Sequence, residues 1–425
     1  MTVIGIDIGT TTICGMLYDV EGRRILSELT LPDMEPEALT GAQDPEFIYS
    51  QVVRILEALR REDTAAAGFS SQMHGILYLD SEGRALSPFY SWQNQEGKGL
   101  EEEVSERLGF RVYTGYGLVT HKALGAVPEG ASVFCNIGDY VAMRLSGRKE
   151  PLSDISMAAS LGIWDGEVTD AFPEDSRYFP AVTAEAEAIG EWNGITVTTA
   201  LGDNQCSFLG SVTDLDSDIV LSYGTSGQLS FYSAGNERLP GFERRPLGKD
   251  GFIQVAFSLA GGESFRLLSR FFEEVLEMAG AVSERPMYEI LDSLRLEDEG
   301  ISCKPFFLGE RGKPGSSAVF SGITRENFRP EAFTYALLDG MAWELWRFYD
   351  SLPEETKREK ARLVGTGNGI LRNPGLQRLL KERYGMPLVP GKGGSTLGAV
   401  MNALVAIGHY PDYRTSVKEF NNTCR

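Results

Sequence analysis

The sequence predicts an α/β protein built from two similar domains, and two observations lead to this expectation. An apolar strand that ends in Gly-Thr and turns at once into a second strand occurs twice, at Gly9-Thr10-Thr11 and at Gly224-Thr225-Ser226. The two glycines are 215 residues apart, about half of the 425-residue chain. A single hydrophobic core rarely extends beyond about 250–300 residues. We therefore expect one domain over residues 1–213 and a second over 214–425, with the boundary in the polar stretch near 212–218.

The first domain is expected to open with three short strands, over residues 3–8, 12–18 and 25–31. Apolar residues at helical spacing then predict a helix over 46–61. A buried strand should follow at 65–69, and another near 196–201. The order strand-strand-strand-helix-strand is that of the ribonuclease-H-like fold of actin-like ATPases. We therefore expect two ribonuclease-H-like domains that face each other across a cleft.

The second domain is expected to repeat this plan. Its predicted elements are strands at 219–223 and 227–232, helices at about 264–279 and 330–351, a strand at 362–364, and a last helix that begins near Ser395. Asn373 can cap a further helix whose first residue is Pro374, where the missing N–H is harmless.

Composition narrows the class of protein. A formal net charge of −20 disfavours a broad nucleic-acid interface. The five cysteines are widely spaced, which argues against a zinc site or a disulfide framework. The apolar run 397–407 is too short to cross a bilayer, and no signal-like segment opens the chain. We expect a cytoplasmic protein without a nucleic-acid or membrane partner.

The repeated hairpin predicts a phosphate site, because glycine tolerates the turn and leaves the backbone N–H groups accessible. ATP is the expected ligand. A third segment, at 365–368, places two close glycines between a strand and a helix, where a flat ring can approach the backbone. The expected ATP and phosphate residues are Gly9, Thr10, Thr11, Gly224, Thr225, Ser226, Gly365, Thr366, Gly367 and Asn368.

Two aspartates stand where phosphoryl transfer needs carboxylates. Asp7 precedes the first Gly-Thr turn, and a carboxylate beside phosphate is favourable when Mg²⁺ lies between them. Asp203 follows a glycine at the end of a buried strand, where it can orient a hydroxyl and accept its proton. A helix cap is the alternative for Asp203, and both roles can coexist. We expect Asp203 as the catalytic base and both aspartates near the metal.

Two segments of the first domain suit a polyol. Gln72-Met73-His74 and Trp92 combine hydrogen-bonding side chains with an aromatic face. The alternative is that the histidine and the tryptophan are structural. With Asp203, the expected sugar-binding residues are Gln72, Met73, His74 and Trp92.

These motifs together resemble the FGGY carbohydrate kinases over essentially the whole chain. The matching segments are Gly5-Ile6-Asp7-Ile8-Gly9-Thr10-Thr11-Thr12, Ser71-Gln72-Met73-His74-Gly75, Trp92-Gln93, Gly138-Asp139-Tyr140, Ser153-Asp154, Gly202-Asp203-Asn204-Gln205, Tyr223-Gly224-Thr225-Ser226, Leu308-Gly309-Glu310-Arg311 and Gly365-Thr366-Gly367-Asn368. The resemblance implies Mg²⁺- and ATP-dependent phosphorylation of a sugar hydroxyl. It implies Asp203 as the catalytic aspartate and Asp7 as the one associated with the metal.

Within that family, the wording of the segments at 90–94, 139–143 and 367–374 resembles sedoheptulokinases, which implies a seven-carbon ketose as substrate. A pentulose kinase similar to xylulokinases is the alternative, and an actin-like ATPase is the alternative outside the kinases. The chain departs from many relatives at Cys14, where they carry Lys or Arg, and at Gln95-Glu96, after the tryptophan motif. A homodimer is one of the assemblies that the sequence leaves open.

Overall fold

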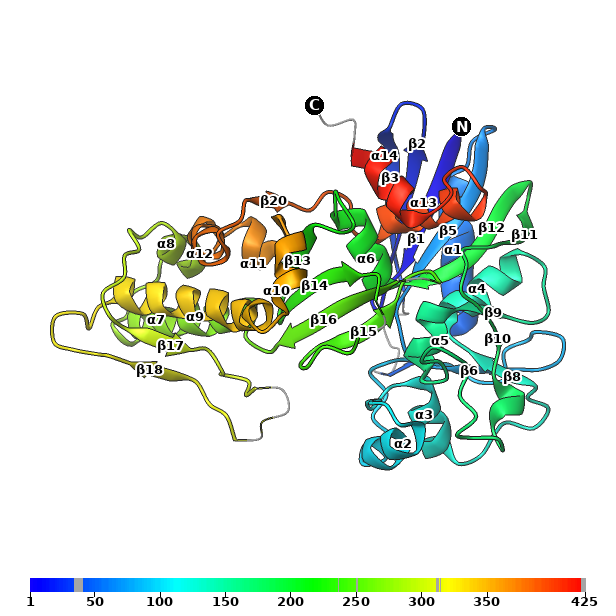
Figure 1. Cartoon of the computed structure of the whole chain (residues 1–425), viewed down its shortest axis with the longest axis horizontal. Coiled ribbons are helices and arrows are strands. Elements are labelled where there is room, and N and C mark those ends of the chain that lie inside the picture. The colour runs from blue at the N-terminus through cyan, green and yellow to red at the C-terminus, as the bar shows by residue number, and fades with distance from the viewer. Residues whose placement is uncertain (34–40, 236, 250, 311–312, 314, 422–425) are drawn as a thin grey trace. The chain divides into compact units, whose positions relative to one another are not determined.

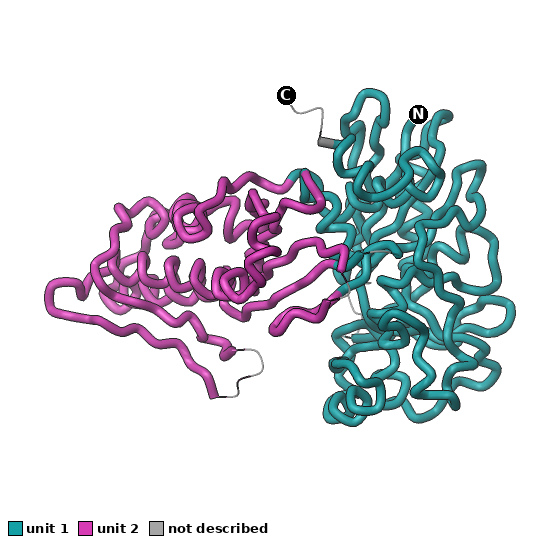
Figure 2. Tube along the Cα trace, in the orientation of Figure 1, with its two compact units in different colours: residues 1–213, 245–252, 392–425 teal, residues 214–244, 253–391 magenta. Residues whose placement is uncertain are grey.

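The computed structural model describes residues 1–33, 41–235, 237–249, 251–310, 313 and 315–421. Contacts divide the chain into two compact units (Figure 2). Unit 1 contains residues 1–213, 245–252 and 392–425, and unit 2 contains residues 214–244 and 253–391. Of the residues named above, Arg311 lies outside the described part of the chain, and so does one of the five cysteines, Cys424.

Unit 1 is built on a six-stranded sheet with the strand order β11-β12-β5-β1-β2-β3. Strands β1, β2 and β3 form an antiparallel meander, whereas β5 runs parallel to β1 and β12 runs parallel to β5. The bounds are β1 (Thr2–Ile8), β2 (Thr12–Asp19), β3 (Arg24–Pro32), β5 (Thr64–Ser71), β11 (Ala188–Trp192) and β12 (Ile195–Gly202). Short pairs are formed by β4 (Ala42–Gln43) with β7 (Phe89–Tyr90), β6 (Leu77–Leu79) with β8 (Val133–Cys135), and β9 (Leu152–Asp154) with β10 (Ala181–Thr183).

The helices of unit 1 pack against this sheet or lie in its connections. They are α1 (Pro45–Leu59), α2 (Glu101–Leu108), α3 (Gly117–Leu124), α4 (Ile137–Leu145), α5 (Ile155–Leu161), α6 (Asp203–Ser211), α13 (Gly394–Ala406) and α14 (Tyr413–Asn421). Helix α1 begins where predicted, because the Asp44 side chain accepts a hydrogen bond from the Glu46 amide at 2.8 Å and Pro45 occupies the first turn. Its buried face, with Ile48, Val52 and Ile55, covers the strands.

Unit 2 repeats the same sheet plan with the order β15-β16-β14-β13-β19-β20. Strands β13 and β14 form an antiparallel hairpin, and β19 and β20 add parallel strands. The strands are β13 (Asp218–Tyr223), β14 (Gly227–Ser233), β15 (Glu243–Pro246), β16 (Phe252–Ser258), β17 (Ser302–Lys304), β18 (Val319–Ser321), β19 (Arg362–Thr366) and β20 (Leu388–Pro390). The helices are α7 (Gly262–Met278), α8 (Met287–Asp292), α9 (Pro330–Asp350), α10 (Glu354–Glu359), α11 (Asn368–Leu371) and α12 (Pro374–Tyr384). The α/β class is confirmed.

The division differs from the two consecutive halves expected from the sequence, because the chain returns to unit 1 from residue 392 onward. Helix α13 packs directly on β1, β5 and α6, and Figure 1 shows this red helix beside the blue strand β1. The packing uses glycines at which a side chain has no room. A Cβ on Gly5 would lie 2.1 Å from the Thr396 carbonyl oxygen, and one on Gly398 would lie 2.0 Å from the Cys206 carbonyl oxygen. Backbones at such close approach join α13 to the first sheet.

The longest helix of unit 2 is α9, which runs beside β17 and α12 (Figure 1). Its buried face, including Leu337, Met341 and Leu345, belongs to the core that the second sheet shares. Among the helices of the described ranges, none has the length and apolar character to cross a membrane.

Candidate active site

Asp7 lies near the end of β1, next to the first hairpin, and both of its carboxylate oxygens accept a hydrogen bond. Ser70 Oγ on β5 donates to Oδ1 at 2.6 Å, and Ser395 Oγ on α13 donates to Oδ2 at 2.6 Å. Ser70 lies opposite Asp7 because β1 and β5 pair in register. No site role was predicted for Ser395, since it is 388 residues away from Asp7 along the chain. Two serines from different elements therefore fix the orientation of the Asp7 carboxylate.

Asp203 is the first residue of α6 and follows β12 directly. Gly202 occupies the N-cap position, and no side chain caps this helix, so the structure does not use Asp203 as the cap. Burial and, after it, the negative charge of Asp7 raise the pKa of Asp203, which has a net value of about 7. The positive charge of Arg245 and a hydrogen bond from the Asn204 backbone act in the opposite direction. Asp203 is thus a carboxyl whose pKa lies close to neutral pH, as a general base requires.

Met73 lies close to Arg245 and to Gly202, the residue that precedes Asp203. Arg245 Nη1 is 3.7 Å from Met73 Sδ, and a Cβ on Gly202 would lie 3.0 Å from the same sulfur. Arg245 comes from the part of β15 that belongs to unit 1, a segment for which no site role was predicted. Because Arg245 is far along the chain from the other site residues, no local sequence motif indicated that it belongs to the site. The structure therefore adds one cation to the predicted site.

His74 has a positive φ of 64°, and its ring is held on two sides. The backbone N–H of His74 donates to Ser160 Oγ at 3.0 Å, and Nδ1 lies 2.8 Å from the Ser160 carbonyl oxygen. Because a carbonyl only accepts, Nδ1 carries the hydrogen, so Nε2 is the acceptor of the neutral ring. The ring also stacks on Tyr116 with centroids 4.1 Å apart. A fixed ring with a defined tautomer suits recognition of a hydroxyl.

Trp92 and Gln72, the other two predicted sugar residues, differ in exposure. Trp92 is 45% exposed, and its Nε1 donates to Thr10 Oγ1 at 2.9 Å. Gln72 is buried, and its Nε2 donates to the Gly9 carbonyl at 3.3 Å and to Gln43 Oε1 at 2.9 Å. The structure thus places Gln72 beneath the first hairpin, which differs from the sugar contact expected for it. The reason is that its amide satisfies buried backbone and side-chain groups.

The second hairpin, Gly224-Thr225-Ser226, is exposed between the paired residues Tyr223 and Gly227. The Gly224 amide donates to the Ser226 carbonyl at 3.1 Å. A Cβ on Gly224 would meet no heavy atom within 4 Å, so this glycine borders open space. The backbone of this hairpin is therefore accessible to a ligand.

The segment 365–368 lies against this second hairpin. Gly367 has a φ of +77°, and a Cβ on it would lie 2.5 Å from the Tyr223 carbonyl oxygen and 3.3 Å from the Gly224 nitrogen. Thr366 Oγ1 is 3.5 Å from the Leu221 carbonyl oxygen, and Asn368 is exposed at the start of α11. Gly365 is buried within β19, where a Cβ would lie 2.7 Å from Ile370 Cγ2. The structure brings the second hairpin and this segment together within unit 2.

Two further glycines support the second hairpin, and the sequence analysis missed both. The Gly262 amide donates to the Gly224 carbonyl at 2.8 Å. A Cβ on Gly261 would lie 2.4 Å from the Ser226 carbonyl carbon. The pair Gly261-Gly262 at the start of α7 was a visible signal, since adjacent glycines before a helix often mark a close backbone approach.

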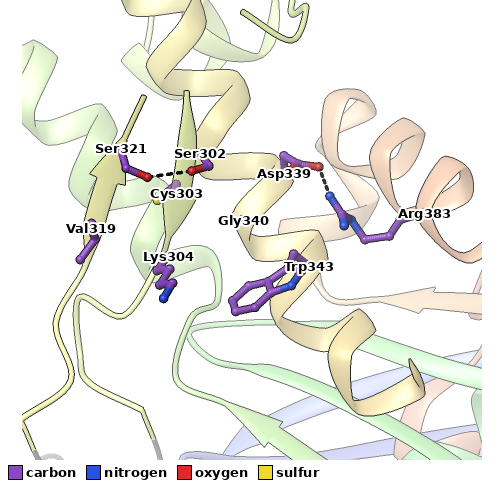
Figure 3. Close-up of a pocket in the computed structure, with 9 residues that line it drawn as sticks. All are labelled: Ser302, Cys303, Lys304, Val319, Ser321, Asp339, Gly340, Trp343 and Arg383. Carbon is purple, nitrogen blue, oxygen red and sulfur yellow. Dashed lines mark hydrogen bonds and ion pairs between the residues drawn. The ribbon is translucent and has the colours of Figure 1, made fainter. Parts of the chain in front are cut away.

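Unit 2 also contains a pocket of about 240 Å³ between β17, β18, α9 and α12 (Figure 3). Arg383 forms an ion pair with Asp339 in its lining, and Ser302 Oγ lies 2.9 Å from Ser321 Oγ. Lys304 and Trp343 line the pocket as well, as Figure 3 shows. Its lining includes none of the residues predicted for phosphoryl transfer.

Asp7 and Asp203 also suit a magnesium ion. Carboxylate oxygens are hard ligands, and Mg²⁺ commonly takes one or two of them and completes its shell with phosphate and water. The described residues contain no group of three or more His, Cys, Asp or Glu side chains that could hold a metal by themselves. A two-carboxylate site thus fits Mg²⁺ bound together with a nucleotide.

Comparison with solved structures shows the fold. A ligand-bound xylulose kinase from Lactobacillus acidophilus superimposes with a TM-score of 0.81 at 20% identity, covering 99% of this chain and 92% of that one. A Plasmodium falciparum glycerol kinase with ADP gives a TM-score of 0.80 at 16% identity, covering 99% and 92%. The prediction of two ribonuclease-H-like domains is confirmed, since such kinases have this fold.

Comparison with characterised sequences gives distant full-length relatives. The xylulose kinase of Lactococcus lactis is 26% identical, covering 98% of this chain and 90% of its own. The sedoheptulokinase of Mus musculus is 25% identical, covering 92% and 94%. The model of the FGGY family of carbohydrate kinases, N-terminal domain, matches residues 2–214, which is half of the sequence. With this match and the site around Asp7 and Asp203, the chain belongs to the FGGY family of carbohydrate kinases.

Proposed function

We propose that this carbohydrate kinase transfers the γ-phosphoryl group of ATP to the terminal hydroxyl of a ketose, with sedoheptulose as the first candidate and a pentulose such as xylulose as the second. The observation that carries the proposal is Asp203, whose pKa of about 7 suits proton abstraction from an alcohol. The full-length similarity to a sedoheptulokinase and to xylulose kinases supports a ketose.

In this proposal Asp203 orients the sugar hydroxyl and accepts its proton. The hydroxyl oxygen forms a bond to the γ-phosphorus while the bond from that phosphorus to the β–γ bridging oxygen breaks, and ADP leaves with the electron pair. Arg245 lies beside Met73 and close enough to Asp203 to affect its pKa, and His74 follows Met73 in the same loop. Trp92 supplies an exposed aromatic face for the carbon skeleton.

Sugar kinases of this family generally use ATP with Mg²⁺. When bound, the ion would neutralise charge on the phosphates and polarise the transferred group. Asp7 is the residue that would hold it, with Asp203 nearby, because two serine hydroxyls already fix the Asp7 oxygens. In unit 2, the accessible backbone of Gly224-Thr225-Ser226 and the adjacent Gly367 would accommodate the nucleotide phosphates.

A sugar acid is a further candidate substrate because of Arg245. This cation lies beside Met73 and Asp203, where a guanidinium can bind the carboxylate of an aldonate. Gluconokinase from Bacillus subtilis is 23% identical to this chain, covering 96% of it and 88% of that enzyme.

One coupled assay of ADP release separates these candidates. The purified protein is supplied with Mg·ATP and, in turn, sedoheptulose, xylulose, ribulose and gluconate. We expect ADP release to require a sugar and kcat/KM to be highest for sedoheptulose. A higher value for a pentulose or for gluconate would replace the seven-carbon assignment and leave the kinase mechanism in place. ATP turnover that is independent of every sugar would favour the actin-like ATPase instead.

A further inference from the structure

Three buried polar side chains, Asp33, Gln43 and Gln72, lie beneath the first hairpin and are called here the Asp33–Gln43–Gln72 cluster. They come from different segments, since Asp33 follows β3, Gln43 ends β4 and Gln72 follows β5. Gln43 Nε2 donates to Asp33 Oδ2 at 2.7 Å, and Gln72 Nε2 donates to Gln43 Oε1 at 2.9 Å. The cluster is therefore internally connected.

The cluster binds consecutive carbonyl groups of the hairpin. Gln72 Nε2 donates to the Gly9 carbonyl at 3.3 Å, and Gln43 Nε2 donates to the Thr10 carbonyl at 3.1 Å. The Asp33 backbone N–H donates to the Thr11 carbonyl at 3.0 Å. Three successive peptide groups are thus held through their oxygens.

This arrangement determines where the hairpin amides point. In a planar trans peptide the C=O of one residue and the N–H of the next point in opposite directions. Carbonyls of Gly9 and Thr10 that are bound by the cluster therefore direct the N–H groups of Thr10 and Thr11 away from it. Within the ranges that the structure describes, these two amides donate to no protein acceptor. They are available to an anion.

Burial also affects the acid at the centre of the cluster. It raises the pKa of Asp33 to about 7, while the hydrogen bond from Gln43 lowers it. Asp33 Oδ1 and Gln72 Oε1 are buried and have no hydrogen-bond partner in the described structure. A protonated Asp33 carboxyl has one O–H donor, which an ionised carboxylate lacks. A neutral side chain at position 33 is therefore compatible with the cluster.

We propose that Asp33, Gln43 and Gln72 are positioning residues that aim the amides of Thr10 and Thr11 at the phosphoryl group during its transfer. The inference rests on the proposed kinase function and goes beyond it. The cluster also links the phosphate site to the predicted sugar site within unit 1. Gln72 immediately precedes Met73 and His74, and Trp92 Nε1 donates to Thr10 Oγ1. A change in the cluster would thus disturb the phosphoryl site without removing a group that touches the sugar.

The test compares Gln43→Met with Gln51→Met. Both glutamines are buried in unit 1, with 3% and 4% of their surface exposed, and methionine keeps their volume. Gln51 lies on α1, where its Oε1 accepts from Arg54 at 2.8 Å. The measurement is the affinity for Mg·ADP alone and for Mg·ADP with aluminium fluoride, which mimics the transferred phosphoryl group, together with kcat.

For Gln43→Met we expect the affinity for Mg·ADP alone to stay within about twofold of the wild-type value. The gain in affinity that aluminium fluoride confers should fall by at least about 10-fold, and kcat should fall by at least about 10-fold as well. Gln51→Met should retain both. Two substitutions at position 33, one conservative and one apolar, test whether a hydrogen-bond acceptor there is enough for the fluoride gain and kcat. Asp33→Asn keeps an acceptor for Gln43 and should recover to within about threefold of the wild type, whereas Asp33→Leu should behave as Gln43→Met does.

A folded Gln43→Met protein that keeps the full fluoride gain would overturn the inference, as would equal values for Asp33→Asn and Asp33→Leu. The position-33 pair decides the matter if Gln43→Met does not fold. Sugar-dependent turnover in the wild type together with an unaffected Gln43→Met protein would refute the inference alone. Absence of sugar-dependent turnover in the wild type would refute the proposed function, and the inference with it.

Discussion

At the scale of single residues, the environment of Asp203 separates it from the other acidic side chains. Many of those are exposed and form surface ion pairs, which contribute little to stability. Asp203 instead combines partial burial, the charge of Asp7 and a neighbouring arginine in one place. Perturbed carboxyls of this kind concentrate at functional sites. The residue that the sequence predicts as the base thus lies in a suitable environment.

Asp203→Asn should lower kcat by about 10²- to 10⁴-fold or more, because the general base and its orienting effect are lost together. Nucleotide affinity should stay near the wild-type value. Steady-state kinetics and calorimetry with Mg·ADP measure the two quantities. A folded Asp203→Asn protein with near-normal kcat would refute the proposed mechanism.

Gly224→Val should raise the KM for ATP and lower kcat, with little loss of thermal stability. The reason is that a side chain at position 224 enters open space and meets no protein atom within 4 Å, so only a bound ligand would encounter it. Gly235→Val is the matched control, since a Cβ there has its nearest neighbour at 3.9 Å. An unchanged ATP KM in the first variant would make the second hairpin a purely structural turn.

His74→Ala should lower kcat/KM for the sugar by about 5- to 150-fold, which corresponds to the loss of one buried hydrogen bond. The Kd for ATP should hardly change, because the ring belongs to the loop that includes Met73. Comparison with Tyr116→Phe, which keeps the stacking partner of His74, controls for disturbance of the ring contact. An equal loss of ATP affinity would contradict the assignment.

At the scale of elements, the sequence predicted those strands and helices that are determined by neighbouring residues. The hairpin strands, α1 and α9 were predicted to within a few residues, because alternation, helical spacing and capping are encoded in neighbouring residues. The return of α13 to unit 1 was not predicted. It depends on contacts between Gly398 and Cys206, which are far apart along the chain.

The same distinction applies to the site. Asp7, Asp203, His74 and Trp92 were visible as residue types at strand ends, where ligands are often bound. Ser395, Arg245 and the Asp33–Gln43–Gln72 cluster were not visible, since each becomes meaningful only through a partner brought close by the fold. Gln72 shows the limit of motif reasoning, because its amide is directed to the Gly9 backbone.

Gly398→Ala should destabilise unit 1 by about 1–3 kcal/mol, because the new methyl group would lie 2.0 Å from a backbone oxygen that cannot move aside. Thermal unfolding monitored by circular dichroism measures the effect. Ala406→Ser, at the half-exposed end of the same helix, is the control and should change little. Equal melting temperatures for the two variants would contradict the close packing of α13.

At the scale of the whole molecule, buried acids should make stability depend on pH. Burial, with a smaller contribution from the charge of Asp154, raises the pKa of Asp139 to about 8, although Ser153 Oγ donates to Asp139 Oδ2 at 2.7 Å and so acts in the opposite direction. In the unfolded chain the pKa of the same carboxyl is about 3.9. The folded state therefore holds a proton that the unfolded state releases between about pH 4 and pH 8.

The free energy of unfolding should accordingly fall as pH rises through this range, by up to about 1.4 kcal/mol per pH unit for this group. Asp139→Asn removes the titration and should flatten the dependence of the melting temperature on pH between 5 and 8. Calorimetric scans at several pH values compare the two proteins. Parallel curves would mean that Asp139 is ionised in the folded state.

The late position of α13 in the chain has a consequence for biosynthesis. The first sheet is complete when residue 202 has been made, but the helix that packs on its β1 and β5 strands spans residues 394–406. In a nascent chain, the face of the sheet that α13 covers must therefore stay without this helix while residues 203–393 are made. Ser395, which orients the Asp7 carboxylate, arrives with that same helix. The Asp7 part of the phosphoryl-transfer site is thus incomplete until residues 394–406 have been made.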